Sequence, residues 1–167
     1  MVYRVIQWGT GRVGTDAVTG IVGHPDLELV GAWVHSAEKD GRDVGELCGM
    51  QPLGVYATRD KDALLAMPAD CVSYATARTW GQDPMTTVAE LERILRSGKN
   101  VVNVAWPALV NSRGVGGGVH ERLQEACLAG GSSLYTGGID PASAAWASRS
   151  QRSPSPARSA ACVRSRS

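Results

Sequence analysis

The 167-residue sequence is long enough for one globular domain, with 43% hydrophobic residues and a formal net charge of +1. Residues 142–167 contain five arginines and no acidic residue, so the first 141 residues carry a net charge of −4. An acidic main body argues against a nucleic-acid surface, and no apolar run approaches the roughly 18 residues that a membrane-spanning helix needs.

Short, valine-rich apolar runs alternate with helical segments through the first 141 residues. The runs show little polar alternation, which is typical of strands covered on both faces of a sheet. The sequence predicts strands at residues 3–8, 27–35, 71–75, 101–104 and 133–135.

Helices are predicted between these strands, at residues 13–22, 61–66, 84–97 and 119–129. The segment 84–97 has Pro84 in its first turn, and Gly98 follows its last residue. Its apolar residues recur at three- and four-residue spacing, so one helix face packs on a sheet. Alternating strands and helices predict right-handed crossovers and an α/β fold with a Rossmann-like, doubly wound parallel sheet.

A glycine-rich turn follows the first predicted strand and opens the first predicted helix. It fits the G-x-G-x-x-G pattern of dinucleotide-binding turns and consists of Gly9, Thr10, Gly11, Arg12, Val13 and Gly14. In this pattern the first glycine permits the tight turn, the second leaves room for the pyrophosphate, and the third lets helix and strand pack closely. The motif therefore predicts a dinucleotide site, with a purely structural turn as the alternative.

The end of the second predicted strand indicates which dinucleotide is bound. NAD-selective proteins usually place Asp or Glu there, whereas this sequence has His35 and Ser36, followed by Lys39 and Arg42. A hydroxyl and nearby cations favour a 2′-phosphate, so NADP(H) is favoured. Glu38 keeps NAD(H) open, and a solvated loop is the alternative role for the two basic residues.

Four segments together resemble a known family: YRVIQWGTGRVG, HPDLELVGAWVHSAEKDGRDVGELCG, SGKNVVN and GGIDP. They are similar to the amino-terminal half of actinobacterial proteins related to dihydrodipicolinate reductase and to the diaminopentanoate and amine dehydrogenases. The resemblance implies an NAD(P)-dependent oxidoreductase that moves hydride to or from a C=N or C–N carbon of a small-molecule substrate. By matching position, it implies cofactor contacts from residues 9–14 and from His35, Ser36, Lys39, Ala75, Thr76 and Ala77.

Two departures from the family concern the substrate. The His-His-x-x-Lys substrate motif of dihydrodipicolinate reductases is absent, and residues 105–118 contain no Asp or Glu to hold an amine. No residue is therefore assigned a catalytic role. His24 and His120 are expected to be structural or exposed, and Tyr135 and Asp140 lie near the end of the last predicted strand without a defined role.

The composition changes after Pro141, where serine, alanine and arginine dominate residues 142–167. We expect a dinucleotide-binding domain at 1–141 and a disordered tail at 142–167, which we hypothesise to be translated out of frame. The carboxyl-terminal substrate domain that the resemblance implies is then missing, so the chain is expected not to catalyse alone. The alternatives are a non-catalytic dinucleotide-binding module, an inert truncated product and, least favoured, an RNA-binding tail. Exposed sheet faces would favour aggregation or a homo-oligomer.

The remaining expectations concern compartment and metals. The amino terminus lacks the basic and apolar segments of a signal peptide, so a cytoplasmic protein is expected. The four cysteines are widely spaced with no C-x-x-C, and therefore no metal site is expected.

Overall fold

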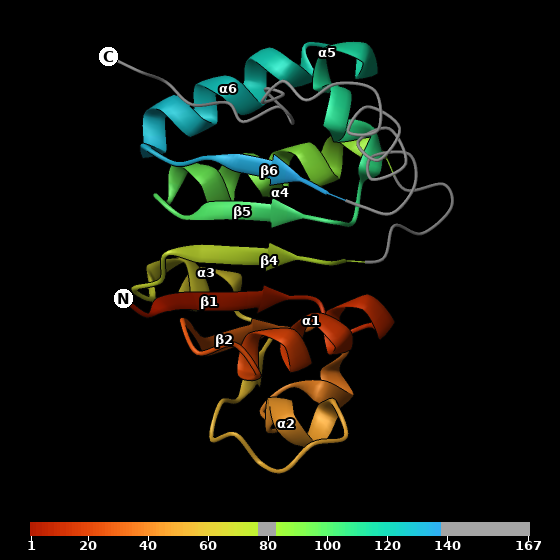
Figure 1. Ribbon diagram of the computed structural model, residues 1–167. Coiled ribbons are helices and arrows are strands. Elements are labelled where there is room, and N and C mark those ends of the chain that lie inside the picture. The colour runs from red at the N-terminus through yellow and green to blue at the C-terminus, as the bar shows by residue number, and fades with distance from the viewer. Residues whose placement is uncertain (77–82, 138–167) are drawn as a thin grey trace, which may run out of the picture.

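The computed structural model describes residues 1–76 and 83–137, so the expectations for Ala77, Asp140 and residues 142–167 lie outside the described residues. The described chain forms a six-stranded parallel sheet of order β3-β2-β1-β4-β5-β6 (Figure 1). The strands are β1 (Tyr3–Trp8), β2 (Leu27–Trp33), β3 (Ala57–Thr58), β4 (Cys71–Tyr74), β5 (Asn100–Asn103) and β6 (Leu134–Thr136). This order confirms the Rossmann-like doubly wound fold.

Helices lie on both faces of the sheet (Figure 1). One face carries α1 (Arg12–Val22) and α2 (Val44–Leu47), and the other carries α3 (Lys61–Ala66), α4 (Pro84–Arg96) and α6 (Val119–Gly130). The connections contain α5 (Ser112–Val115) and two 3₁₀ helices, η1 (Ala37–Lys39) and η2 (Pro107–Asn111).

Each face of the sheet has its own hydrophobic core, because successive strand residues point to opposite faces. In β1, Val5 packs into the core beneath α1 and α2, whereas Ile6 and Trp8 pack into the larger core beneath α3, α4 and α6. Trp8 is completely buried although it is the last residue of β1. The carboxyl end of the sheet is therefore supported by a large aromatic side chain.

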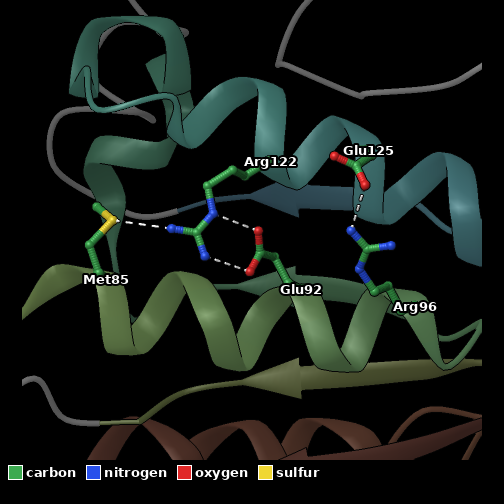
Figure 2. Close-up of polar contacts among 5 residues, drawn as sticks. All are labelled: Met85, Glu92, Arg96, Arg122 and Glu125. Carbon is green, nitrogen blue, oxygen red and sulfur yellow. Dashed lines mark hydrogen bonds and ion pairs between the residues drawn. The ribbon is translucent and has the colours of Figure 1, made fainter.

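The two long helices α4 and α6 are joined by ion pairs along their exposed sides (Figure 2). Arg122 of α6 donates two hydrogen bonds to Glu92 of α4, at 2.8 and 2.7 Å, and its third nitrogen lies 3.6 Å from the sulfur of Met85. One turn further on, Arg96 donates to Glu125 at 2.9 Å. These contacts hold the two helices side by side over β5 and β6.

The predicted elements all occur, with shifted ends and with additions that the sequence did not indicate. β2 ends at Trp33, two residues before the predicted end, and the chain turns into η1. β3 was missed because its two residues are too few to show a strand pattern. α2 was missed because its four residues carry no helical periodicity; it begins where Asp43 accepts hydrogen bonds from the backbone of Gly45 and Glu46.

One face of the sheet is partly open beside α1. There Val102 of β5 is 40% exposed and Tyr135 of β6 is 48% exposed, and no helix of residues 83–137 covers them (Figure 1). A hollow of about 470 Å³ extends from Ile21 of α1 to Val102. Among the described helices, none has the length and apolar character needed to cross a membrane.

Candidate functional site

The glycine turn lies at the carboxyl end of β1, and two of its glycines are required by close packing. Gly9 has a φ of +95°, and a Cβ at this position would lie 2.9 Å from the carbonyl oxygen of Ala75. A Cβ on Gly14 would lie 2.0 Å from the carbonyl oxygen of Gly9. Only glycine fits both positions, because any side chain would displace the backbone of a neighbouring segment.

Gly11 differs from its two neighbours, because a Cβ there would meet nothing within 4 Å. Its backbone is extended and forms the N-cap of α1 without any side-chain cap, and the first turn of α1 contains no acidic residue. The free N–H groups of this turn and the positive end of the helix dipole therefore adjoin open space. This arrangement fits an anionic pyrophosphate at bare backbone.

Gln7 supports the turn from below, and sequence reasoning missed it. Its side chain is fully buried, and its Nε2 donates to the carbonyl oxygen of Gly9 at 2.8 Å. Its Oε1 has no partner among the described residues. The sequence did offer a signal for this role, namely a glutamine inside the apolar run of β1. A buried amide in a strand needs a specific hydrogen-bond partner.

The loop after β2 reaches the glycine turn through Lys39. The Lys39 ammonium donates to the carbonyl oxygen of Thr10 at 2.9 Å and lies 3.4 Å from the Thr10 hydroxyl. Ser36 has a local role, since its hydroxyl accepts a hydrogen bond from the backbone of Glu38 at 3.3 Å and caps η1. The positive charge expected beside a 2′-phosphate is thus held at the glycine turn.

His35 lies at the exposed edge of the same loop. Its ring centroid is 6.1 Å from that of Trp33, with the two planes tilted by 58°. The imidazole is exposed to solvent beside the end of β2, whereas the Trp33 indole is partly buried and packs against the larger core.

The loop after β4 forms the third wall of the site. The backbone N–H of Ala75 donates to the carbonyl oxygen of Trp8 at 2.9 Å, and Ala75 is buried against Gly9. Thr76 is half-buried and follows directly. The structure thus brings the glycine turn, the β2 loop and Ala75–Thr76 together at the carboxyl ends of β2, β1 and β4, where the strand order reverses.

The other residues singled out in the sequence have local partners. His24 accepts a hydrogen bond from the backbone of Asp26 at 3.1 Å, and His120 pairs with the Ser112 hydroxyl at 2.8 Å. Tyr135 is 48% exposed and pairs in register with Val102 of β5. None of these side chains contacts the three walls of the site within the described ranges.

Residues 3–103 match the sequence family described as dihydrodipicolinate reductase, N-terminus. An amine dehydrogenase from Streptomyces virginiae is 37% identical over 137 residues, which cover 81% of this chain and 38% of that protein. A 4-hydroxy-tetrahydrodipicolinate reductase from Synechococcus elongatus is 36% identical over 63 residues, or 38% of this chain and 23% of that protein. The chain spans well under half the length of these relatives.

Solved structures share the fold at low sequence identity. Amine dehydrogenase from Mycobacterium smegmatis superposes with a TM-score of 0.64 at 22% identity, over 79% of this chain and 38% of that chain. Biliverdin reductase from Synechocystis, in complex with biliverdin and NADP⁺, has a TM-score of 0.59 at 23% identity, over 80% of this chain and 37% of that chain. The WlbA dehydrogenase from Bordetella pertussis, in complex with NADH and UDP-GlcNAcA, has a TM-score of 0.59 at 18% identity, over 82% of this chain and 37% of that chain.

Proposed function

This chain belongs to the family of the dihydrodipicolinate reductase amino-terminal domain, and from that premise we propose that residues 9–14 bind the pyrophosphate of a nicotinamide dinucleotide. The observation that carries this proposal is the empty space in front of Gly11 at the uncapped start of α1. Gly9 and Gly14 are glycines for packing reasons, whereas packing gives no reason for glycine at Gly11. A ligand that approaches the backbone does give one.

The residues around the turn have distinct tasks in this proposal. The first-turn N–H groups of α1 bind the pyrophosphate, and Ala75 and Thr76 line the side toward β4. The dinucleotide, when bound, supplies or accepts the hydride. The chain's own contribution is to hold it at the carboxyl end of the sheet in one orientation.

We propose NADP(H) as the preferred dinucleotide, with Lys39 as the selecting residue. Its ammonium is held beside the glycine turn, and the β2 end presents His35 and Ser36 rather than a carboxylate. A 2′-phosphate would gain a charge-assisted hydrogen bond there, whereas a ribose hydroxyl would lack the usual acidic acceptor. The fold itself is compatible with either choice, because its structural neighbours include complexes with NADP⁺ and with NADH.

We further propose that the associated chemistry is hydride transfer at a carbon bonded to nitrogen, as the 37% identity to an amine dehydrogenase supports. Residues 105–118, which follow β5 at the same edge of the sheet, contain no acidic side chain to hold an amine. Substrate-binding groups are therefore proposed to lie outside the described residues. On this proposal residues 1–137 bind the dinucleotide without turning over an imine or ketone.

The proposal is tested by titrating NADPH and NADH separately into the purified chain while following tryptophan fluorescence. Trp8 directly precedes the glycine turn, so a bound nicotinamide is expected to quench its emission. We expect saturable binding of both, with NADPH tighter. The absence of saturable binding of either at millimolar concentration would refute the proposal, and turnover on a panel of imines and ketones would refute the binding-only part.

A further inference from the structure

A partly buried polar cluster joins α3, α4 and the end of β4, with the Lys61 side chain 36% exposed. Glu90 of α4 accepts hydrogen bonds from the Lys61 ammonium at the start of α3 and from the hydroxyl of Tyr74, the last residue of β4. The Glu90 side chain is 17% exposed and Tyr74 is 1% exposed. Burial, and then the Glu90 charge, raise the pKa of Tyr74, so its phenol stays protonated and donates.

One arm of the cluster leads to the glycine turn. The Lys61 ammonium lies 4.5 Å from the centroid of the Trp33 ring, and Trp33 stacks on Trp8 with centroids 5.6 Å apart and planes 20° apart. Trp8 directly precedes Gly9, whose backbone N–H donates to the carbonyl oxygen of Trp33 at 3.0 Å. The position of Lys61 is therefore coupled by direct contacts to the start of the turn.

The other arm leads to the loop after β4. Tyr74 directly precedes Ala75 and Thr76 in the chain, so the bond between its hydroxyl and Glu90 fixes the start of this loop. The intervening residue, Ala75, is bonded through its backbone to Trp8 and touches Gly9. Both arms thus start at Glu90 and end at backbone that the proposed function assigns to the dinucleotide.

We propose that Glu90 is a positioning residue, which holds the glycine turn and the Ala75–Thr76 loop in the geometry that receives the dinucleotide. The inference rests on the proposed function, because it assumes that these segments form the site. A largely buried carboxylate is costly unless its partners stay in place, so one charge restrains Lys61 and Tyr74 together. Segments that are ordered before the dinucleotide arrives lose less conformational entropy on binding, and the affinity for the dinucleotide is therefore higher.

The same helix offers a matched control in Glu92. Its side chain is also 17% exposed, and it forms an ion pair with Arg122 of α6 rather than with α3 or β4 (Figure 2). Glu90→Gln and Glu92→Gln each remove one negative charge and one ion pair from α4. Only the first change touches residues that lead to the proposed site.

The test compares the wild-type chain, Glu90→Gln, Glu92→Gln and Tyr74→Phe by fluorescence titration with NADPH. Because a hydrogen bond to a charged group is lost, we expect Kd to rise about tenfold for Glu90→Gln and Tyr74→Phe and by less than about twofold for Glu92→Gln. A second measurement uses the ligand-free protein. Amide hydrogen exchange at Gly9 and Ala75 is expected to accelerate in Glu90→Gln and not in Glu92→Gln, with exchange of β5 amides as the reference for global stability.

The outcomes separate this inference from the proposed function. Equal effects of Glu90→Gln and Glu92→Gln on Kd, or unchanged exchange at Gly9 and Ala75 in Glu90→Gln, would overturn the positioning role. The wild-type chain could bind neither dinucleotide while amide exchange at Gly9 and Ala75 still accelerates in Glu90→Gln and not in Glu92→Gln. That result would refute the proposed function and support the restraint by Glu90. Tyr74→Phe removes a single hydroxyl and carries the same expectations if Glu90→Gln does not fold.

Discussion

Replacing Gly11 with valine is expected to remove dinucleotide binding and to leave the fold nearly as stable as before. The Gly11 backbone is extended, with φ −77° and ψ −170°, a conformation open to every residue, and a Cβ there meets nothing within 4 Å. The one local cost is a poorer N-cap for α1, about 1 kcal/mol. The added methyl groups would occupy the space that we assign to the pyrophosphate.

The expected loss of affinity follows from the bonds that the pyrophosphate would no longer make. A hydrogen bond to a charged group contributes about 2 kcal/mol, so losing one raises Kd for NADPH roughly 30-fold and losing two raises it roughly 700-fold. Gly14→Ala provides the contrast, because its Cβ would lie 2.0 Å from the Gly9 carbonyl oxygen. That overlap must shift backbone and is expected to cost about 3 kcal/mol of stability.

The assay combines urea unfolding with NADPH titration for Gly11→Val, Gly14→Ala and Gly20→Ala. Gly20 lies inside α1, where a Cβ also meets nothing, so alanine there is expected to gain about 0.5–1 kcal/mol of stability and to leave binding unchanged. If Gly11→Val binds NADPH within about threefold of wild type, the space before Gly11 is not a pyrophosphate site. If Gly14→Ala is as stable as wild type, the packing argument for the turn is wrong.

Three further predictions concern charge, pH and the open sheet face. Lys39→Gln is expected to weaken NADPH binding about tenfold and NADH binding little, by fluorescence titration, because one charge-assisted bond to the 2′-phosphate is lost. Hydrogen bonds from backbone N–H groups, that of Leu53 foremost, hold the pKa of the Asp43 carboxyl below its ordinary value of 3.8. The ionised carboxylate therefore stabilises the fold above pH 3.8, and this stabilisation is lost as the pH falls through the lower pKa of the folded state. Melting temperatures between about pH 5 and pH 2 are therefore expected to fall less in Asp43→Asn than in wild type. Replacing Val102 and Tyr135 together with lysine is expected to reduce concentration-dependent association, measured by sedimentation velocity, because both contribute to the open apolar face.

Each of these predictions has a control on a comparable side chain. Arg4→Gln, at the opposite end of β1, is expected to leave dinucleotide selectivity unchanged. Asp26→Asn, which also removes one carboxylate but from an exposed turn, is expected to leave the hydrogen bonds to Asp43 and their loss on acidification in place. Val22→Lys, at an exposed position of α1, is expected to leave concentration-dependent association unchanged. If a control variant changes selectivity, acid sensitivity or association as much as the variant it is paired with, the physical argument for that prediction is wrong.

The elements that the sequence predicted are those formed by local interactions. The run 3–8 became β1 with the predicted ends, because six consecutive strand-forming residues meet a glycine with positive φ. α4 begins where predicted, since Asp83 accepts a hydrogen bond from the backbone of Met85 and Pro84 is preorganised for a first turn. β3 left no such signal, because two residues become a strand only through pairing with β2.

The sequence by itself determined five of the six strands, the longer crossover helices and the position of the glycine turn, because apolar periodicity and glycine spacing are properties of adjacent residues. Tertiary structure decided the contacts around that turn. Lys39 bonds to Thr10 across 29 residues, and Glu90 joins Lys61 and Tyr74 from separate elements. Such pairs depend on strand order, which brings the ends of β2, β1 and β4 together, and no local pattern specifies which polar side chains then meet.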